Sequence, residues 1–276
     1  MNSTLKSLFP HLVAIAAFIL LSSIYFSPLF DGYSLKQSDI RQFQGMSKEI
    51  VDYEFVHGEK PLWTNAMFGG MPTYQISVDH NANWLTYVDQ AIKLGLPRPV
   101  GILFVSMLGF YILALCLRVN PWLGIIGAIA FGFSTINVLY IGAGHMSKVN
   151  AIAYMAPALG GLILAFRGKW LLGAAVFGLF FGLNLTANHL QMTYYLSFLL
   201  GAVALSEVIR LALQKEWVYL GKTVGALTVV STLTLMASAS NLMTTFEYSK
   251  YTTRGTSDLT LKPKGQAAKM TAKEGL

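Results

Sequence analysis

The stretch Val100–Arg118, VGILFVSMLGFYILALCLR, decides the class of this protein. It carries no charged residue before Arg118. A helix needs roughly 20 predominantly apolar residues to cross a bilayer. Comparable stretches recur along the chain at Leu8–Pro28, Trp122–Ile141, Val149–Phe166, Trp170–Ala187, Met192–Leu213 and Val218–Leu242. Because unpaired backbone groups are costly in lipid, each stretch is predicted to be a helix. The sequence therefore predicts an all-α polytopic membrane protein with about seven transmembrane helices.

The composition agrees with this class. Hydrophobic residues make up 54% of the chain and charged residues only 12%, about half the charged fraction of a soluble domain. The stretch Trp122–Ile141 is rich in glycine and carries Ser134, Thr135 and Asn137. Its outer end is expected to be either broken or buried against neighbouring helices.

The distribution of Lys and Arg predicts how the chain is oriented. One side of the predicted topology receives Lys6, Arg118, Arg167, Lys169, Arg210, Lys215 and Lys222. The short loops on the other side receive only Lys148. Because short cytoplasmic loops carry the excess of basic residues, the N-terminus is predicted to be cytoplasmic and the C-terminus outside. The net charge of +7 follows mostly from this pattern, and no basic stripe with interleaved aromatics indicates a nucleic-acid partner.

The first outer loop, residues 29–99, is predicted to be structured, because about 70 residues are too many for a bare connection. A helix is expected over Asp39–Val56, with Ser38 as its N-cap and Gly58 at its end. The glycines and prolines of Pro61–Pro72, PLWTNAMFGGMP, exclude a regular helix there.

A second loop helix is expected over Asn83–Leu94. It would place Trp84, Leu85, Val88, Ala91 and Ile92 on one side and lie in the membrane interface. The predicted organisation is a transmembrane domain, residues 1–243, which contains this outer loop. A polar outer segment, residues 244–276, follows and reads as the start of a truncated loop, with a disordered tail as the alternative.

Several motifs carry a resemblance to a known family. An apolar span, then Gln37-Ser38-Asp39-Ile40 and PLWTNAMFGGMP, resembles bacterial YfhO-type membrane proteins. Gly144–Lys148, Asn188–Gln191 and Glu247–Ser249 strengthen the resemblance, which covers nearly the whole chain. That family is similar to polyprenyl-phosphate-dependent glycosyltransferases of the GT-C fold. Its members are considerably longer, which favours an N-terminal portion here.

The resemblance implies a site on the outer face of the bacterial inner (cytoplasmic) membrane. There, a sugar would move from a polyprenyl-phosphate donor to a cell-envelope glycan or lipid acceptor. Asp39 would be the catalytic base, because a hydroxyl acceptor must lose its proton. The substrate-binding residues would be His145, Lys148, Asn188, His189, Gln191, Glu247, Tyr248 and Arg254. The characteristic residues of the loop motif are Trp63, Asn65, Phe68, Gly69 and Gly70.

Each assignment has a structural alternative. Asp39 could be a helix-start carboxylate stabilised by the helix dipole, and Lys148 a lysine that reaches the membrane interface. Asn188, His189 and Gln191 could form a simple turn between helices. No spacing demands a metal site. Many GT-C enzymes carry an acidic motif such as Asp-x-Asp at this position, whereas this chain has Asp39 alone. The resemblance therefore leaves a divalent metal possible without requiring one.

Two further functions stay open beside the glycosyltransferase. A transporter or flippase of a lipid-linked substrate would place polar groups near the bilayer midplane and show inverted repeats. Neither is evident, whereas the charged residues gather at the rim. A non-catalytic membrane scaffold is the third alternative. The chain has neither a P-loop nor a dinucleotide-binding glycine motif after a strand.

Overall fold

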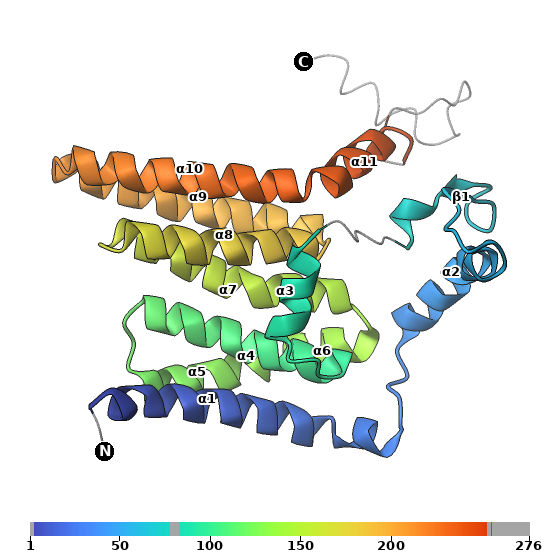
Figure 1. The fold of residues 1–276 in the computed structure, drawn as a ribbon, viewed down its shortest axis with the longest axis horizontal. Helices are drawn as coiled ribbons and strands as arrows, with labels where there is room; N and C mark the ends of the chain where they lie inside the picture. Colours follow the sequence, from blue (N-terminus) through green and yellow to red (C-terminus); the bar gives the residue numbers. More distant parts are fainter. Residues whose placement is uncertain (1–2, 78–82, 253–254, 256–276) are drawn as a thin grey trace, which may run out of the picture. The chain divides into compact units, whose positions relative to one another are not determined.

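The computed structural model describes residues 3–77, 83–252 and 255 (Figure 1). The chain divides into two units, Met1–Ser238 and Ala239–Leu276, which are described separately. The long helices of the first unit are α1 (Ser3–Tyr25), α2 (Ser38–His57), α4 (Arg98–Cys116), α7 (Met146–Phe166), α8 (Trp170–Thr186), α9 (Leu190–Leu213) and α10 (Trp217–Ala237). Its shorter helices are η1 (Ser27–Asp31), η2 (Thr73–Gln75), α3 (Leu85–Ile92), α5 (Pro121–Gly132) and α6 (Thr135–Ala143). The second unit contains α11 (Ala239–Ser249).

The core of the first unit forms where α7 packs between α4 and α8, and most of the α7 side chains are buried. Small residues allow this close packing. A β-carbon at Gly173 would overlap the backbone of Ala165, and one at Gly161 would overlap the backbone of Phe177. The glycines therefore set how closely α7 and α8 approach.

The helical class is confirmed, and every predicted apolar stretch lies in helices. Five helices are long and apolar enough to cross a membrane, namely α1, α4, α7, α9 and α10. The pair α5 and α6 is bent by 43° at Phe133 and Ser134, which confirms that this stretch is broken. The helix α8 is apolar but has only 17 residues.

The prediction of one helix over Val218–Leu242 is wrong at its end. Helix α10 ends at Ala237, and α11 begins at Ala239 after a break at Ser238. Serine and asparagine side chains compete for backbone hydrogen bonds and weaken a helix. The run Ser238-Ala239-Ser240-Asn241 interrupts the apolar sequence at this point.

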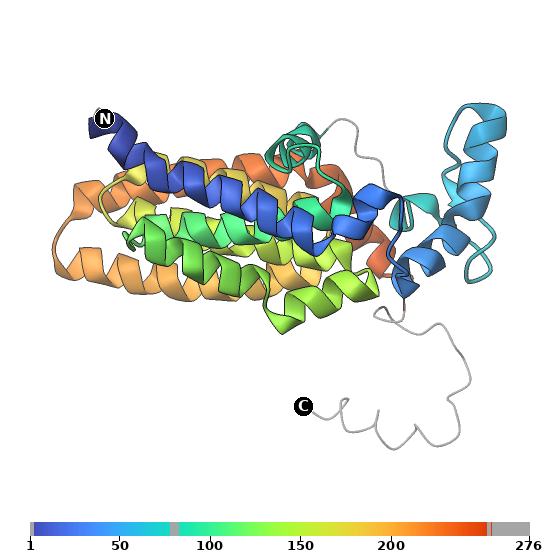
Figure 2. The same cartoon turned by 90° about the horizontal axis from the view of Figure 1, so that it is seen from below.

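The two ends of the bundle differ. Figures 1 and 2 show the α4–α5, α7–α8 and α9–α10 connections at one end and α2, α3 and α6 at the other. The first of these, called the basic end below, carries Arg118, Arg167, Lys169, Arg210 and Lys215. The opposite end, called the loop end, carries the start of α2 with Asp39, the turn with His145 before α7 and the turn with His189 before α9.

The expected loop helix over Asp39–Val56 is confirmed as α2, which ends where Gly58 adopts a left-handed conformation, φ +73°. The prediction that Ser38 caps it is wrong, because the N-cap is Gln37 and no side chain caps the helix. Instead, Gln37 Nε2 donates to the Ile141 carbonyl at 2.5 Å and Ser38 Oγ to the Ala143 carbonyl at 3.3 Å. These carbonyls lie in the last turn of α6, where no intrahelical donor is available.

The stretch Pro61–Pro72 is not helical, as predicted, and forms a short antiparallel pair of β1 (Trp63–Thr64) and β2 (Met71–Pro72). The helix expected over Asn83–Leu94 is confirmed as α3. Its Leu85, Val88 and Ile92 pack against the core. The placement of Trp84 and Ala91 on that same face is wrong: Trp84 precedes the helix and is 82% exposed, and Ala91 is also exposed.

Candidate functional site

Asp39 and His145 meet at the loop end. Asp39 lies in the first turn of α2, and His145 is the residue immediately before α7. Asp39 Oδ2 lies 2.7 Å from His145 Nδ1, and both side chains remain accessible, at 40% and 43% exposure. The expectation that these two residues lie close together is confirmed. Carboxylate and imidazole groups are the usual side chains of general acid–base catalysis.

Gly144 makes this contact possible. Its φ of +98° lies in the left-handed region, where a side chain is strained. A β-carbon there would also lie 3.2 Å from the side chains of Gln37 and Ile40 and 3.3 Å from Asp39 Cβ. The start of α2 therefore packs directly on the Gly144 backbone, which holds Asp39 beside the next residue, His145.

Lys148 lies one turn beyond His145 on α7. Its Nζ is 4.2 Å from the centre of the Tyr140 ring, and that ring lies edge-on to the His145 imidazole at 5.7 Å. A cation over an aromatic face is stabilised electrostatically. Tyr140 therefore places an ammonium group and an imidazole on the same rim, a role that the sequence did not indicate.

His189 lies near this group, in the turn between α8 and α9. Burial lowers the pKa of its imidazole, and the charges of Lys148 and His145 lower it further. Its Nδ1 atom is buried and has no hydrogen-bond partner in the described part of the chain. A neutral imidazole with an unpaired nitrogen is suited to bind a hydroxyl or a phosphate oxygen.

The other polar residues of this turn behave differently. Asn188 adopts a left-handed conformation, φ +54°, which forms the turn. Gln191 Nε2 donates to the Tyr195 hydroxyl at 2.9 Å, one turn along α9. Gln191 thus bonds along its own helix, whereas the charges of Lys148 and His145 act on His189.

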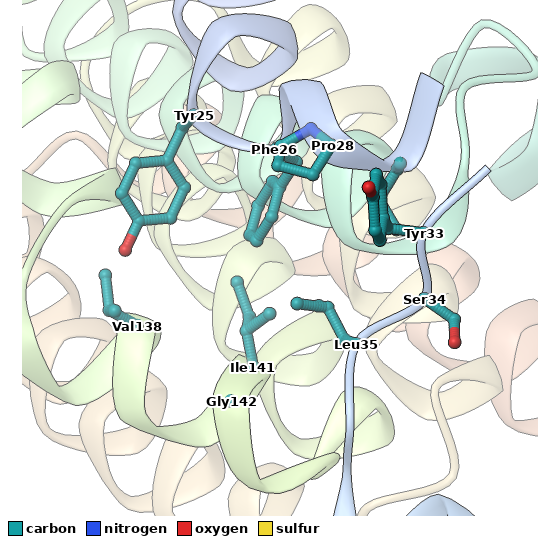
Figure 3. Close-up of a pocket in the computed structure, with 10 residues that line it drawn as sticks. Tyr25, Phe26, Pro28, Tyr33, Ser34, Leu35, Val138, Ile141 and Gly142 are labelled. Atoms are coloured by element: carbon teal, nitrogen blue, oxygen red, sulfur yellow. The ribbon is translucent and has the colours of Figure 1, made fainter. Parts of the chain in front are cut away.

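An apolar cavity of about 300 Å³ lies between the end of α1, the segment that follows it and α6 (Figure 3). Tyr25, Phe26 and Leu35 approach it from the end of α1 and the following segment, and Val138 and Ile141 from α6. Ile141 also accepts the Gln37 hydrogen bond, so one turn of α6 forms the cavity wall and supports the start of α2. The cavity has the size and lining of a site for a hydrocarbon group.

The loop motif is held by Glu49 of α2. The Glu49 carboxylate accepts hydrogen bonds from Thr64 Oγ1 and from the backbone amides of Ala66 and Asn65, at 3.0 and 3.1 Å. The Thr64 hydroxyl and the Ala66 amide lower the pKa of Glu49. Sequence reasoning missed Glu49, because its partners follow 15 to 17 residues later in an irregular segment.

The predicted motif residues form a compact turn of their own. Trp63 Nε1 donates to Asn65 Oδ1 at 3.2 Å. Gly70, with φ +126°, lies against the Trp63 ring, from which a β-carbon would be only 2.8 Å away. Gly69 also has a positive φ, and Phe68 is 88% exposed. These contacts run to α2 and within the motif rather than to the Asp39–His145 pair.

Three predicted site residues follow α10. Glu247 and Tyr248 lie in α11, which belongs to the second unit, and Arg254 lies outside the described residues. Their convergence with Asp39 therefore stays a prediction.

A second polar cluster joins α3 to α7. Asp89 Oδ2 accepts from Lys93 Nζ at 2.6 Å, and Asp89 Oδ1 accepts from the Tyr154 hydroxyl at 2.5 Å and from Asn150 Nδ2 at 3.4 Å. Burial lowers the pKa of Lys93, and the charge of Asp89 opposes this effect. The cluster fixes α3 to the bundle. The Asp89–Lys93 spacing of four residues is typical of an ion pair on a helix. No feature of the sequence indicated that Tyr154 of α7 would contact Asp89.

Residues 3–77, 83–252 and 255 contain no group of three or more His, Cys, Asp or Glu side chains arranged to hold a metal ion. Comparison of the chain with family models, curated proteins and solved structures finds no match.

Proposed function

We propose that this protein is a membrane glycosyltransferase that moves a sugar from a polyprenyl-phosphate donor to a cell-envelope glycan or lipid on the outer face. The observation that carries the proposal is the accessible Asp39–His145 pair at the loop end. Lys148 and His189 provide polar groups beside it, and the neighbouring cavity is apolar. A substrate with a charged head and a hydrocarbon tail matches this combination.

The reaction needs a base and a stabilised leaving group. Asp39 would take the proton from the acceptor hydroxyl while the hydroxyl oxygen attacks the anomeric carbon of the donor sugar. The bond between that carbon and the phosphate oxygen breaks, and the electron pair leaves with the polyprenyl phosphate. Lys148 and protonated His145 would stabilise the added negative charge on the phosphate. The first isoprene units would lie in the cavity formed by Tyr25, Phe26 and Ile141.

The membrane arrangement belongs to the same proposal. The broken pair α5–α6 and the short helix α8 would each cross the membrane, which gives about seven spans with the basic end in the cytoplasm. The loop end would face outward, and the C-terminus would lie outside. The motif residues of the Trp63–Gly70 turn and the resemblance to YfhO-type proteins support a GT-C-like first outer loop in a bacterial inner membrane.

The test replaces the base while keeping its shape. Asp39→Asn should lower sugar transfer from polyprenyl-phosphate donors by about 10²–10⁴-fold, the contribution of a positioned base. Asp52→Asn is the matched control, because Asp52 lies on the same helix and is also paired, with Lys48 at 2.7 Å. Radiolabelled transfer is measured in membranes that contain equal amounts of each protein.

Equal activity of the Asp39→Asn variant and the Asp52→Asn control would remove Asp39 from the mechanism. Absence of transfer from the unaltered protein with every donor would instead favour the transport or scaffold alternative. Both variants should insert equally, because Asp39 and Asp52 are at least 40% exposed and exposed ion pairs contribute little stability.

A further inference from the structure

A buried carboxylate organises the basic end of the bundle, far along the chain from the site above. The Glu207 side chain of α9 is only 6% exposed. Its Oε1 accepts from Arg167 Nε at 3.1 Å, and its Oε2 accepts from Arg210 Nε at 2.7 Å. Two arginines from different segments therefore share one buried acid, so one positive charge of the three groups is left over.

The two arginines differ in what remains free. Each of the three nitrogen atoms of Arg210 donates a hydrogen bond within the protein, because Nη1 also donates to Gln214 Oε1 at 2.8 Å and Nη2 to the Phe166 carbonyl at 3.1 Å. Arg167, which is 57% exposed, is paired within the described part of the chain only through Nε. Its two terminal amino groups remain available as a planar pair of donors, the arrangement that matches a phosphate.

Arg167 and Arg210 line a cavity of about 540 Å³ between the ends of α7, α9 and α10. The Tyr219 hydroxyl fixes one wall, because it donates to the Ala165 carbonyl at 2.6 Å and accepts from the Gly168 amide at 2.8 Å. Glu216 also lines the cavity, so one carboxylate shares it with the two arginines. The pocket therefore has a rigid frame and one arginine directed to solvent or ligand.

The surroundings place this cavity at the level of lipid headgroups. Trp170 and Trp217 are the first residues of α8 and α10, and tryptophans gather at membrane–water interfaces. Trp217 is 61% exposed, and the neighbouring Leu213 and Val218 are 79% and 74% exposed. An apolar surface for acyl chains thus adjoins the polar cavity.

We propose that this cavity binds the phosphate of an anionic phospholipid headgroup through Arg167. The free guanidinium donors select an anion, and the exposed apolar helix ends favour a lipid over a soluble phosphate. Basic pockets between membrane helices are known to take such headgroups. The site is independent of the proposed sugar transfer, because it lies at the other end of the bundle.

The experiment counts phosphatidylglycerol molecules retained by the purified protein in native mass spectrometry, with phosphatidylcholine as the neutral comparison. Arg167→Gln should lower phosphatidylglycerol retention about tenfold, the effect of losing a charge-assisted hydrogen bond. Glu207 keeps Arg210 as a partner in this variant. Lys169→Gln, two residues away and outside the cavity lining, removes the same charge and should leave retention unchanged.

Unchanged phosphatidylglycerol retention in the Arg167→Gln variant would overturn the proposal. An equal loss of retention in the Lys169→Gln control would also overturn it, because the lipid would then respond only to the total positive charge of the basic end. Inorganic phosphate is tested separately in detergent. If it binds in an Arg167-dependent way while phosphatidylglycerol does not, the lipid assignment is wrong. Arg167→Lys keeps the charge without the planar donors and should recover part of the retention if the variants fold alike.

Discussion

Replacing Gly144 by alanine tests whether the start of α2 is held on the Gly144 backbone. An L-residue in the left-handed conformation that Gly144 adopts costs about 1–2 kcal/mol. The added methyl would also press on Gln37, Ile40 and Asp39 at 3.2–3.3 Å, a separation that requires these neighbours to move. The variant should therefore weaken the docking of α2 while leaving the bundle core intact.

Hydrogen exchange followed by mass spectrometry measures this effect. If the free energy of local opening falls by this conformational cost alone, amides in the first turns of α2 should exchange roughly 5–30-fold faster. Peptides from α4 should keep their protection, because α4 is buried in the core. Gly142→Ala is the control, because Gly142 lies in α6 and a β-carbon there meets nothing within 4 Å. Equal exchange of the α2 peptides in the two variants would refute the docking argument.

Two predictions concern pH. The pKa of Glu49 is lowered in the folded protein, so its stabilisation of the Thr64–Ala66 turn is present above the ordinary carboxyl pKa and lost as the pH falls through the folded pKa. Hydrogen exchange of the Ala66 amide should show this loss, and Glu49→Gln should remove the pH dependence; a turn equally protected at acid pH would contradict the clamp. The pKa of His189 is also lowered, so the unfolded chain binds its proton first and stability should fall as the pH drops below about 6.5. Lys148→Met removes a nearby positive charge and should raise the His189 pKa in an NMR titration, whereas an unchanged pKa would show that the two groups are not coupled.

The long apolar helices could be predicted from the sequence because a helix that crosses a bilayer needs roughly 20 apolar residues. The break in Trp122–Ile141 was one of the expected alternatives, since Ser134 and the glycines weaken a continuous helix. The end of α10 was predicted too late, because Leu242 and Met243 extend the apolar pattern beyond the polar Ser238.

The contacts of the loop end could be predicted only in part. The proximity of Asp39 and His145 followed from the expected topology, which places both on one side of the membrane. The hydrogen bond from Gln37 to Ile141 could not be predicted, because it joins residues 104 positions apart in the sequence. The Asp89 contact with Tyr154 is equally a product of packing between distant segments.

The break before α6 has a mechanical consequence. Helix α6 has nine residues, so it acts as a lever about 14 Å long between Ser134 and the His145 end. A swing of about 10° around Ser134 would move that far end by about 2 Å. The pivot is stiffened by Asn137 Nδ2, which donates to the Phe131 carbonyl at 2.9 Å across the break. A small angular displacement at this pivot would therefore move the Ile141 and Ala143 carbonyls, and with them the start of α2 that carries Asp39.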